Sequence, residues 1–128
     1  MNSPEGRPIR LEFEGEEIYA RMGQAIPCGL IVNELVTNSV KHAFPEGWDG
    51  EPTIRVSVRK GGNGLVILGV RDNGKGLPPG FRIRESKTLG LSLVFLLTEQ
   101  LGGTIAPSRE GGAGFSLQFT PGGRTGRK

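Results

Sequence analysis

The chain has 128 residues and a mass of 13.7 kDa, a length that favours one domain over two. Its formal net charge of +3 is matched by three basic side chains within the last five residues, so the rest of the chain is balanced and a nucleic-acid-binding domain is not indicated. One cysteine and one histidine exclude a disulfide framework and a cysteine/histidine metal cluster, and no apolar run approaches the ~18 residues of a membrane span, so we expect a soluble cytoplasmic domain without membrane contact.

Residues 1–8 are a lead-in to the first regular element. Apolar and charged residues alternate over 9–13, which predicts a half-buried strand, and a weaker pattern suggests a second strand over 17–22. Apolar residues then recur at helical spacing over 24–44. Pro27 is compatible with the first turn of this predicted helix, where its missing N–H has no partner.

The second half of the chain divides at glycine-rich turns. Its predicted elements are a hairpin over 53–60 and 65–70, a loop over 72–81, a helix over 89–101, a second hairpin over 104–106 and 115–119, and a basic tail over 121–128. Leu93, Leu97 and Leu101 mark the apolar side of the helix, and two glycines follow it as a stop signal. The pattern predicts an α+β fold, in which helices cover one face of a mostly antiparallel sheet.

A polar stripe lies on the first predicted helix. At ~100° per residue, Glu34, Asn38 and Lys41 fall within about 60° of one another, opposite the aliphatic side chains. The amide oxygen suits a hydrated Mg²⁺ that carries phosphates, the ammonium can neutralise phosphate charge, and the carboxylate can accept a proton. A solvated helix face is the alternative. On the same helix we expect His42 to be a packing or pocket-lining residue and Cys28 a small buried hydrophobe.

A tight turn follows the most apolar predicted strand. Asp72 closes that strand, and its carboxylate can accept a hydrogen bond from an amino group such as N6 of adenine. Gly74 and Gly76 would let a planar ring approach the backbone, although an ordinary turn is the alternative. The segment from Gly69 nearly matches a P-loop, but Gly76 replaces its Ser or Thr and two prolines prevent the helix that must follow.

A third candidate segment begins the second predicted helix. Gly90 exposes backbone N–H groups near the helix N-terminus, and Lys87 and Thr88 add a cation and a hydroxyl. Such a helix start can bind an anion such as phosphate, and an ordinary helix start is the alternative.

The order and spacing of these segments resemble the GHKL ATPases, which include sensor histidine kinases, DNA gyrase and a heat-shock chaperone. The similar segments are the N box at 26–43, the G1 box at 72–76, the G2 box at 88–91 and the closing strands at 101–104 and 114–117. The N box is most similar to that of the HWE-type histidine kinases. The resemblance covers residues 9–120 and implies the Bergerat fold, an α/β sandwich with ATP held between helices and a lid over 77–90.

The resemblance also implies roles for the residues that match these boxes. Glu34 would be the catalytic base, Asn38 the Mg²⁺ ligand and Asp72 the acceptor for adenine N6. The other nucleotide-binding residues that it implies are Lys41, His42, Gly74, Gly76, Lys87, Thr88, Gly90, Leu91 and Thr104. Two features depart from the family pattern: Thr88 stands where the G2 box usually has glycine, and the lid is short.

The implied function is that of the ATP-binding catalytic domain of a sensor histidine kinase, which donates the γ-phosphoryl of ATP to a histidine. Nothing upstream of residue 9 can form dimerisation helices, so we expect the histidine on a separate dimerisation domain, with a response regulator as an indirect partner. The chain alone is expected to be a monomer. Two alternatives stay open: a serine protein kinase of the anti-sigma type, and a degenerate module that binds nucleotide without turnover.

Overall fold

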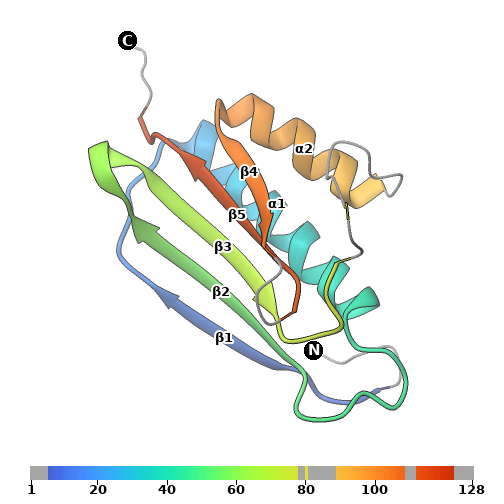
Figure 1. Cartoon of the computed structure of the whole chain (residues 1–128). Helices are drawn as coiled ribbons and strands as arrows, with labels where there is room; N and C mark the ends of the chain where they lie inside the picture. The colour runs from blue at the N-terminus through green and yellow to red at the C-terminus, as the bar shows by residue number, and fades with distance from the viewer. Residues whose placement is uncertain (1–5, 78–79, 81–88, 109–111, 123–128) are drawn as a thin grey trace.

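The computed structural model describes residues 6–77, 80, 89–108 and 112–122. Five strands form one sheet in the order β1-β2-β3-β5-β4 (Figure 1). The elements in chain order are β1 (Arg10–Gly15), α1 (Met22–His42), β2 (Thr53–Lys60), the short 3₁₀ turn η1 (Gly62–Gly64), β3 (Val66–Asp72), α2 (Leu89–Leu101), β4 (Thr104–Ser108) and β5 (Gly114–Phe119). β1 pairs with β2 in parallel and the other three pairings are antiparallel, which confirms the prediction of a mixed, mostly antiparallel sheet.

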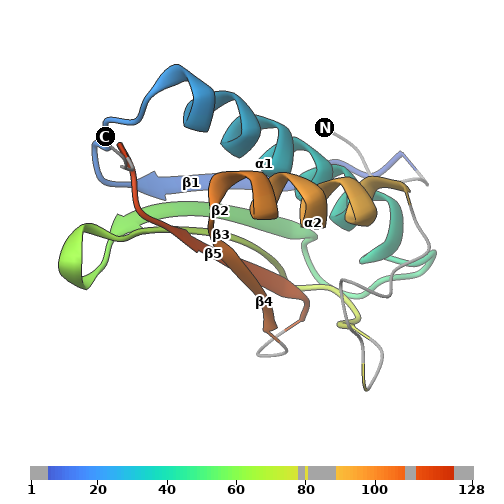
Figure 2. The ribbon, with the colours of Figure 1, turned by 90° about the horizontal axis from the view of Figure 1, so that it is seen from above.

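Both helices lie on the same side of the sheet, so the molecule has two layers (Figure 2). Alternation along the central strands turns one set of side chains toward the helices. The buried members of this set are Ile54, Val56, Val66, Leu68, Val70, Phe115, Leu117 and Phe119. They form one core with buried side chains of the helices, such as Ile31, Leu35 and Val94. Burial of this apolar surface explains why the α+β fold predicted from the alternation is the fold observed.

The predictions for two segments at the start of the chain, the strand over 17–22 and the helix over 24–44, are wrong in detail. Residues 17–20 are not a strand, because pairing with β2 ends where the Glu16 N–H donates to the Val58 carbonyl. α1 begins at Met22 and ends at His42, and this places Pro27 beyond the first turn. Its ring removes the hydrogen bond to the carbonyl of Gly23, which is exposed and can bond water instead.

The apolar side of α2 differs from the predicted one by a rotation about the helix axis. Leu91, Val94 and Leu97 are buried, whereas Leu93 is 37% exposed. Gly102 ends the helix as predicted, because its φ of +71° suits the left-handed conformation that glycine adopts without strain. Neither helix in the described part of the chain has the length and apolar character of a membrane span.

Candidate functional site

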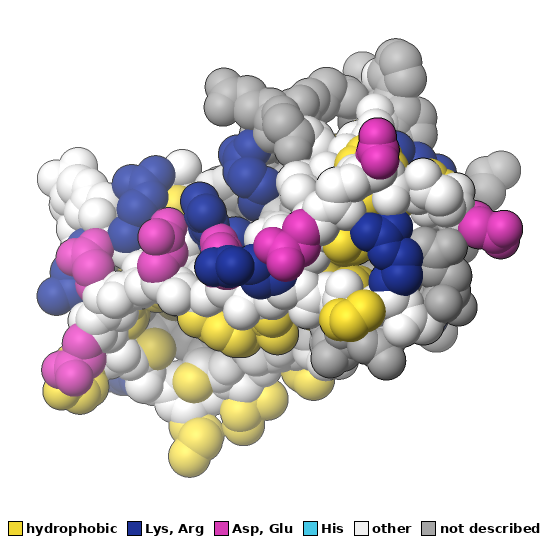
Figure 3. Space-filling model, turned by 90° about the horizontal axis from the view of Figure 1, so that it is seen from below, with side chains coloured by type: hydrophobic (Ala, Val, Ile, Leu, Met, Phe, Trp, Pro, Cys, Tyr) yellow, Lys and Arg dark blue, Asp and Glu magenta, His cyan; other side chains and the backbone are white. Residues whose placement is uncertain are grey.

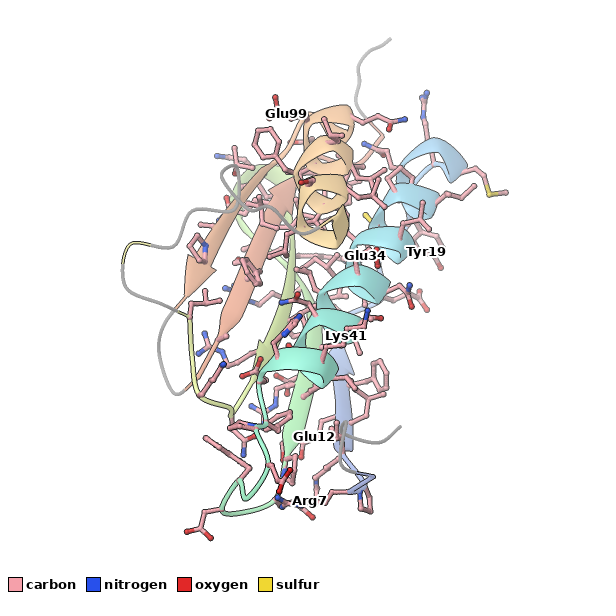
Figure 4. All side chains as sticks on the ribbon, turned by 90° about the vertical axis from the view of Figure 1, so that its right-hand side faces the viewer. Arg7, Glu12, Tyr19, Glu34, Lys41 and Glu99 are labelled. Carbon is pink, nitrogen blue, oxygen red and sulfur yellow. The ribbon has the colours of Figure 1, made fainter. Side chains whose placement is uncertain are left out.

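The candidate residues gather where the end of β3, the C-terminal half of α1 and the start of α2 meet. Asp72 is the last residue of β3. Its side chain is linked to Ser39 of α1, and the first turn of α2 lies against Glu34 of the same helix. Figure 4 shows Glu34 and Lys41 at two levels of α1. Three segments far apart in the sequence therefore meet at one end of the sandwich.

Asp72 is a buried carboxylate, only 3% exposed, and three donors hold it in place. Oδ2 accepts a hydrogen bond from Oγ of Ser39 at 2.8 Å. Oδ1 accepts from the backbone N–H groups of Gly74 at 2.9 Å and Ala113 at 3.2 Å. Because a buried charge is stable only when it is hydrogen-bonded, these donors explain how a carboxylate sits at the end of an apolar strand. Sequence reasoning missed Ser39 and Ala113.

Asn73 fixes the turn to the start of β2. Its Oδ1 accepts from the N–H of Thr53 at 2.9 Å, and its Nδ2 donates to the carbonyl of Glu51 at 3.0 Å. Its own N–H donates to the carbonyl of Thr53 at 3.2 Å. The tight-turn interpretation is therefore correct for Asn73, and the turn is also tied to a neighbouring strand.

Gly74 has a packing role that the sequence interpretation did not foresee. A Cβ at this position would overlap the carbonyl oxygen and the Cβ of Ala43 at the end of α1. The adjacent N–H of Lys75 donates to the same carbonyl at 2.9 Å. The missing side chain thus lets the turn pack closely against the end of α1. Gly76 has φ +86° and lies near Gly112, so its glycine character is required by the backbone conformation.

Gly74→Ala is expected to lower the free energy of unfolding by about 2 kcal/mol, because overpacking against backbone forces a shift of the turn or the helix. Gly29→Ala is the matched control: its Cβ would meet nothing within 4 Å on α1, and the change should raise stability by up to about 1 kcal/mol. Urea unfolding of both variants measures the two values. Equal effects of the two substitutions would contradict the close packing of Gly74 against Ala43.

The predicted stripe on α1 divides into two parts. Glu34 and Asn38 are half-buried, and a Cβ built on Gly90 would lie 3.5 Å from Oε1 of Glu34. Lys41 and His42 are exposed in the last turn of α1. The expected packing role of His42 is therefore wrong, and its role as a pocket-lining residue stays a prediction. The stripe therefore has one end against the start of α2 and one end in solvent.

Other predicted site residues lie elsewhere. Leu91 is part of the core, and Lys87 and Thr88 lie outside the described residues, as does most of the predicted lid. Thr104 pairs with Gln118, whose partner on β3 is Ile67, five residues before Asp72. At ~3.3 Å per residue that separation is about 17 Å along the sheet. The structure does not bring Thr104 to the candidate site, so Thr104 is not placed to bind nucleotide there.

Cys28 packs against the core and is half-buried, close to the predicted environment. Burial raises the pKa of its thiol to about 11. A nucleophilic role requires the thiolate, which this environment disfavours at neutral pH. Cys28 is therefore not a candidate for covalent chemistry.

Comparison with known proteins gives a consistent result. The sequence profile of the family described as histidine kinase-, DNA gyrase B-, and HSP90-like ATPase matches residues 23–123. The sensor histidine kinase PdtaS of Mycobacterium tuberculosis is 35% identical over 125 residues, which is 94% of this chain and 24% of that protein. The chain thus spans about a quarter of the length of that relative. Blue-light-activated histidine kinase 2 of Erythrobacter litoralis is 30% identical over 112 residues, 87% of this chain and 32% of that protein.

Among solved structures, a blue-light-activated histidine kinase of Erythrobacter litoralis superposes with a TM-score of 0.81. The match covers 91% of this chain and 37% of that one at 23% sequence identity. This similarity establishes the fold and agrees with the sequence comparisons.

Proposed function

Because the chain belongs to the family of histidine kinase-, DNA gyrase B- and HSP90-like ATPases, we propose that it is the ATP-binding catalytic domain of a sensor histidine kinase. It binds ATP with Mg²⁺ and donates the γ-phosphoryl to a histidine on a separate dimerisation domain, from which a response regulator later receives it. The observation that carries the proposal is the buried Asp72 carboxylate, which Ser39 holds against α1, the helix whose Glu34 lies against the start of α2.

Recognition of the base follows from the chemistry of Asp72. An ionised carboxylate is only an acceptor, and Ser39, Gly74 and Ala113 use three of its roughly four lone-pair directions. The remaining direction can accept from the amino group of adenine. Guanine presents a carbonyl oxygen at the equivalent ring position, and that oxygen would be repelled. The site therefore favours ATP over GTP.

The phosphates and the metal ion are assigned to α1. Mg²⁺ prefers oxygen ligands and keeps several waters together with substrate phosphates, so it needs few protein ligands. The half-buried amide of Asn38, one turn beyond Glu34, fits that requirement. Described residues contain no group of three or more His, Cys, Asp or Glu side chains that could form an all-protein metal site, which agrees with a metal held mainly by phosphate. When bound, Mg²⁺ supplies neutralisation of phosphate charge, and Lys41 adds a cation from the exposed end of the helix.

Glu34 is assigned to proton transfer and orientation of the acceptor. Its carboxylate faces the first turn of α2, where backbone N–H groups of a helix start favour phosphate. Glu34, the proposed general base, and the expected position of the terminal phosphate thus lie on neighbouring elements. The acceptor is assigned to another domain because the sensor histidine kinase PdtaS, a relative of this chain, is about four times its length.

Calorimetric titration of the chain with ATP, with and without Mg²⁺, tests the nucleotide site. We expect saturable binding that Mg²⁺ strengthens. GTP at the same concentrations is the control and should bind at least about fivefold more weakly, since a mispaired buried acceptor costs about 1–3 kcal/mol. Absence of ATP binding would leave a nucleotide-independent module, and equal binding of GTP would contradict the role of Asp72.

A further inference from the structure

β1 is an edge strand of the sheet, and no other described element lies beyond it (Figure 1). In a parallel pair, every second residue of a strand bonds to its neighbour. The N–H groups of Arg10 and Glu16 donate toward the β2 side. The backbone N–H and C=O groups of Leu11, Phe13 and Gly15 therefore point away from the sheet, where no described strand pairs with them. Such a row of backbone groups is a template for pairing with a further strand.

The helix-facing side of β1 carries apolar side chains that stay exposed. Phe13 pairs with the core residue Val56, yet Phe13 is 69% exposed, and Leu11 on the same side is 36% exposed. A groove of 620 Å³ lies beside Phe13, and its apolar lining includes Ile18, Val56 and Val58. Figure 3 shows hydrophobic side chains gathered along a hollow below the band of charged side chains. The edge thus offers apolar contact area together with backbone groups that can form hydrogen bonds.

The sequence of β1 is complementary to a second, antiparallel copy of itself. With Glu12 at the two-fold axis, Leu11 lies opposite Phe13 of the second copy on the apolar side. Both residues direct their backbone groups to the edge, so each such pair exchanges two hydrogen bonds. On the other side of the strand, Arg10 lies opposite Glu14 of the second copy. Apolar pairs and opposite charges placed directly across two strands stabilise a sheet.

The charges of β1 distinguish this register from the next one. Moving the axis by one residue toward the C-terminus would place Glu12 opposite Glu14 twice, and like charges directly opposite each other are destabilising. In the favoured register the two copies of Glu12 meet at the axis, but each is already paired with Arg10 at 2.7 Å and Arg55 at 2.9 Å. Arg10 uses Nε for that bond and has a longer contact of 3.8 Å to Glu51, so further N–H donors of its guanidinium can bind Glu14. Glu14 forms no ion pair with another described residue.

We propose that two copies of this chain associate through β1, antiparallel about a two-fold axis at Glu12, so that the two five-stranded sheets become continuous. The same surface is used by both copies, as in most homodimers. The association replaces the monomer expected from the sequence. Asp72 is on β3, the second strand from β1, so the pairing does not use the candidate nucleotide site. A single strand pair is a small interface, and the dimer is therefore weak and dependent on concentration.

Sedimentation equilibrium of the chain without nucleotide, over a range of protein concentrations, tests the association. The average molar mass should rise reversibly from that of a monomer toward that of a dimer. Phe13→Lys should raise the dimer dissociation constant by about tenfold, because it enters the interface twice and puts a charge in each apolar pair. Leu96→Lys is the matched control: Leu96 is 62% exposed on α2, and its substitution should leave the dissociation constant unchanged.

An exchange of charges tests the pair formed by Arg10 and Glu14. Glu14→Arg places two arginines opposite each other on both sides of the axis and should weaken association severalfold. Adding Arg10→Glu to the same chain restores opposite charges in both pairs and should recover most of the loss. Two exposed side chains without a contact between the copies would show no such recovery, and that result would overturn the register.

Cysteine cross-linking in a Cys28→Ala background locates the two-fold axis. The two copies of residue 12 form a pair without mutual hydrogen bonds, whose Cα atoms are about 4.5 Å apart, within the range of a disulfide. With oxidised glutathione, Glu12→Cys should therefore give a covalent dimer. Glu14→Cys is the matched control, because its two copies lie on opposite sides of the axis, and it should cross-link much more slowly.

Three results would overturn the proposal. A chain that stays monomeric at every concentration would leave the edge to a strand of another protein. Loss of the dimer in Leu96→Lys but not in Phe13→Lys would place the interface on the helices. Faster cross-linking of Glu14→Cys than of Glu12→Cys would exclude the proposed axis. None of these results bears on the proposed function, since ATP binding is measured separately by calorimetry.

Discussion

Asp72→Asn is expected to weaken ATP binding by roughly 10- to 100-fold while the chain stays folded, since a hydrogen bond to a charged group contributes about 1.5–3 kcal/mol. Asparagine can keep the local partners of this side chain. Its Oδ1 can accept from the N–H groups of Gly74 and Ala113, and its Nδ2 can donate to Oγ of Ser39. The amide nitrogen, however, presents a donor to the amino group of adenine where the carboxylate presents an acceptor. Calorimetry with ATP measures the loss.

Two further variants separate binding from stability. Asp49→Asn is the matched control, because Asp49 is the one other aspartate of the chain and is exposed; its ATP affinity should be unchanged. Asp72→Ala leaves two backbone N–H groups and a hydroxyl without their acceptor and should lower the free energy of unfolding by about 2–4 kcal/mol. If Asp72→Asn binds ATP as well as the unchanged chain does, the carboxylate has only a structural role.

The strands were predictable because burial and alternation leave a direct pattern in the sequence. Ile54 and Val56 alternate with polar residues, Leu68 and Val70 lie in a largely apolar run, and the structure places all four in one core. The segment 17–22 has a weaker alternation that does not reach the sheet, since the neighbouring strand offers no further pairing beyond Glu16. β1 forms because it pairs with β2, although Phe13 is 69% exposed, and residues 17–20 lack such a pairing.

The site was predictable only where one residue carries its own chemical signal. Asp72 is a carboxylate at the end of an apolar strand, and Glu34 is a carboxylate on a helix. The structure places Asp72 against Ser39 of α1 and Glu34 against the first turn of α2. Ser39 and Ala113 gave no such signal, because their role depends on contacts with a residue 33 and 41 positions away. The packing of Gly74 on Ala43 depends on the same long-range closure.

The position of Glu34 on α1 suits the proposed transfer of phosphate to another domain. Glu34 is half-buried against the start of α2 and remains partly accessible from solvent, which suits the general base that we propose. The exposed end of α1, with Lys41, leaves room for another domain to approach. In the proposed function, an acceptor histidine of another domain would meet the terminal phosphate between α1 and α2.

Glu34→Gln should therefore slow transfer strongly while binding persists. We expect the rate of phosphotransfer from ATP to a supplied dimerisation domain to fall by about 10²- to 10⁴-fold, the range for loss of a general base. The ATP dissociation constant should change by less than about threefold, because glutamine has nearly the same shape as glutamate. The adenine ring of ATP is proposed to contact Asp72 and not Glu34. Radiolabelled ATP and gel analysis measure transfer, and lability of the product in acid distinguishes phosphohistidine from phosphoserine.

The control is Glu99→Gln, which removes an exposed carboxylate in the last turn of α2, whereas Glu34 lies against the first turn of that helix (Figure 4). It should transfer phosphate at the unchanged rate. If Glu34→Gln transfers phosphate at the unchanged rate, Glu34 is not a general base. Catalysis would then come from the positioning of ATP alone. Loss of both binding and transfer would instead place Glu34 in nucleotide binding, and an acid-stable product would favour the serine kinase alternative. The two measurements together thus separate the base, the binding residue and the acceptor, which no single activity assay can do.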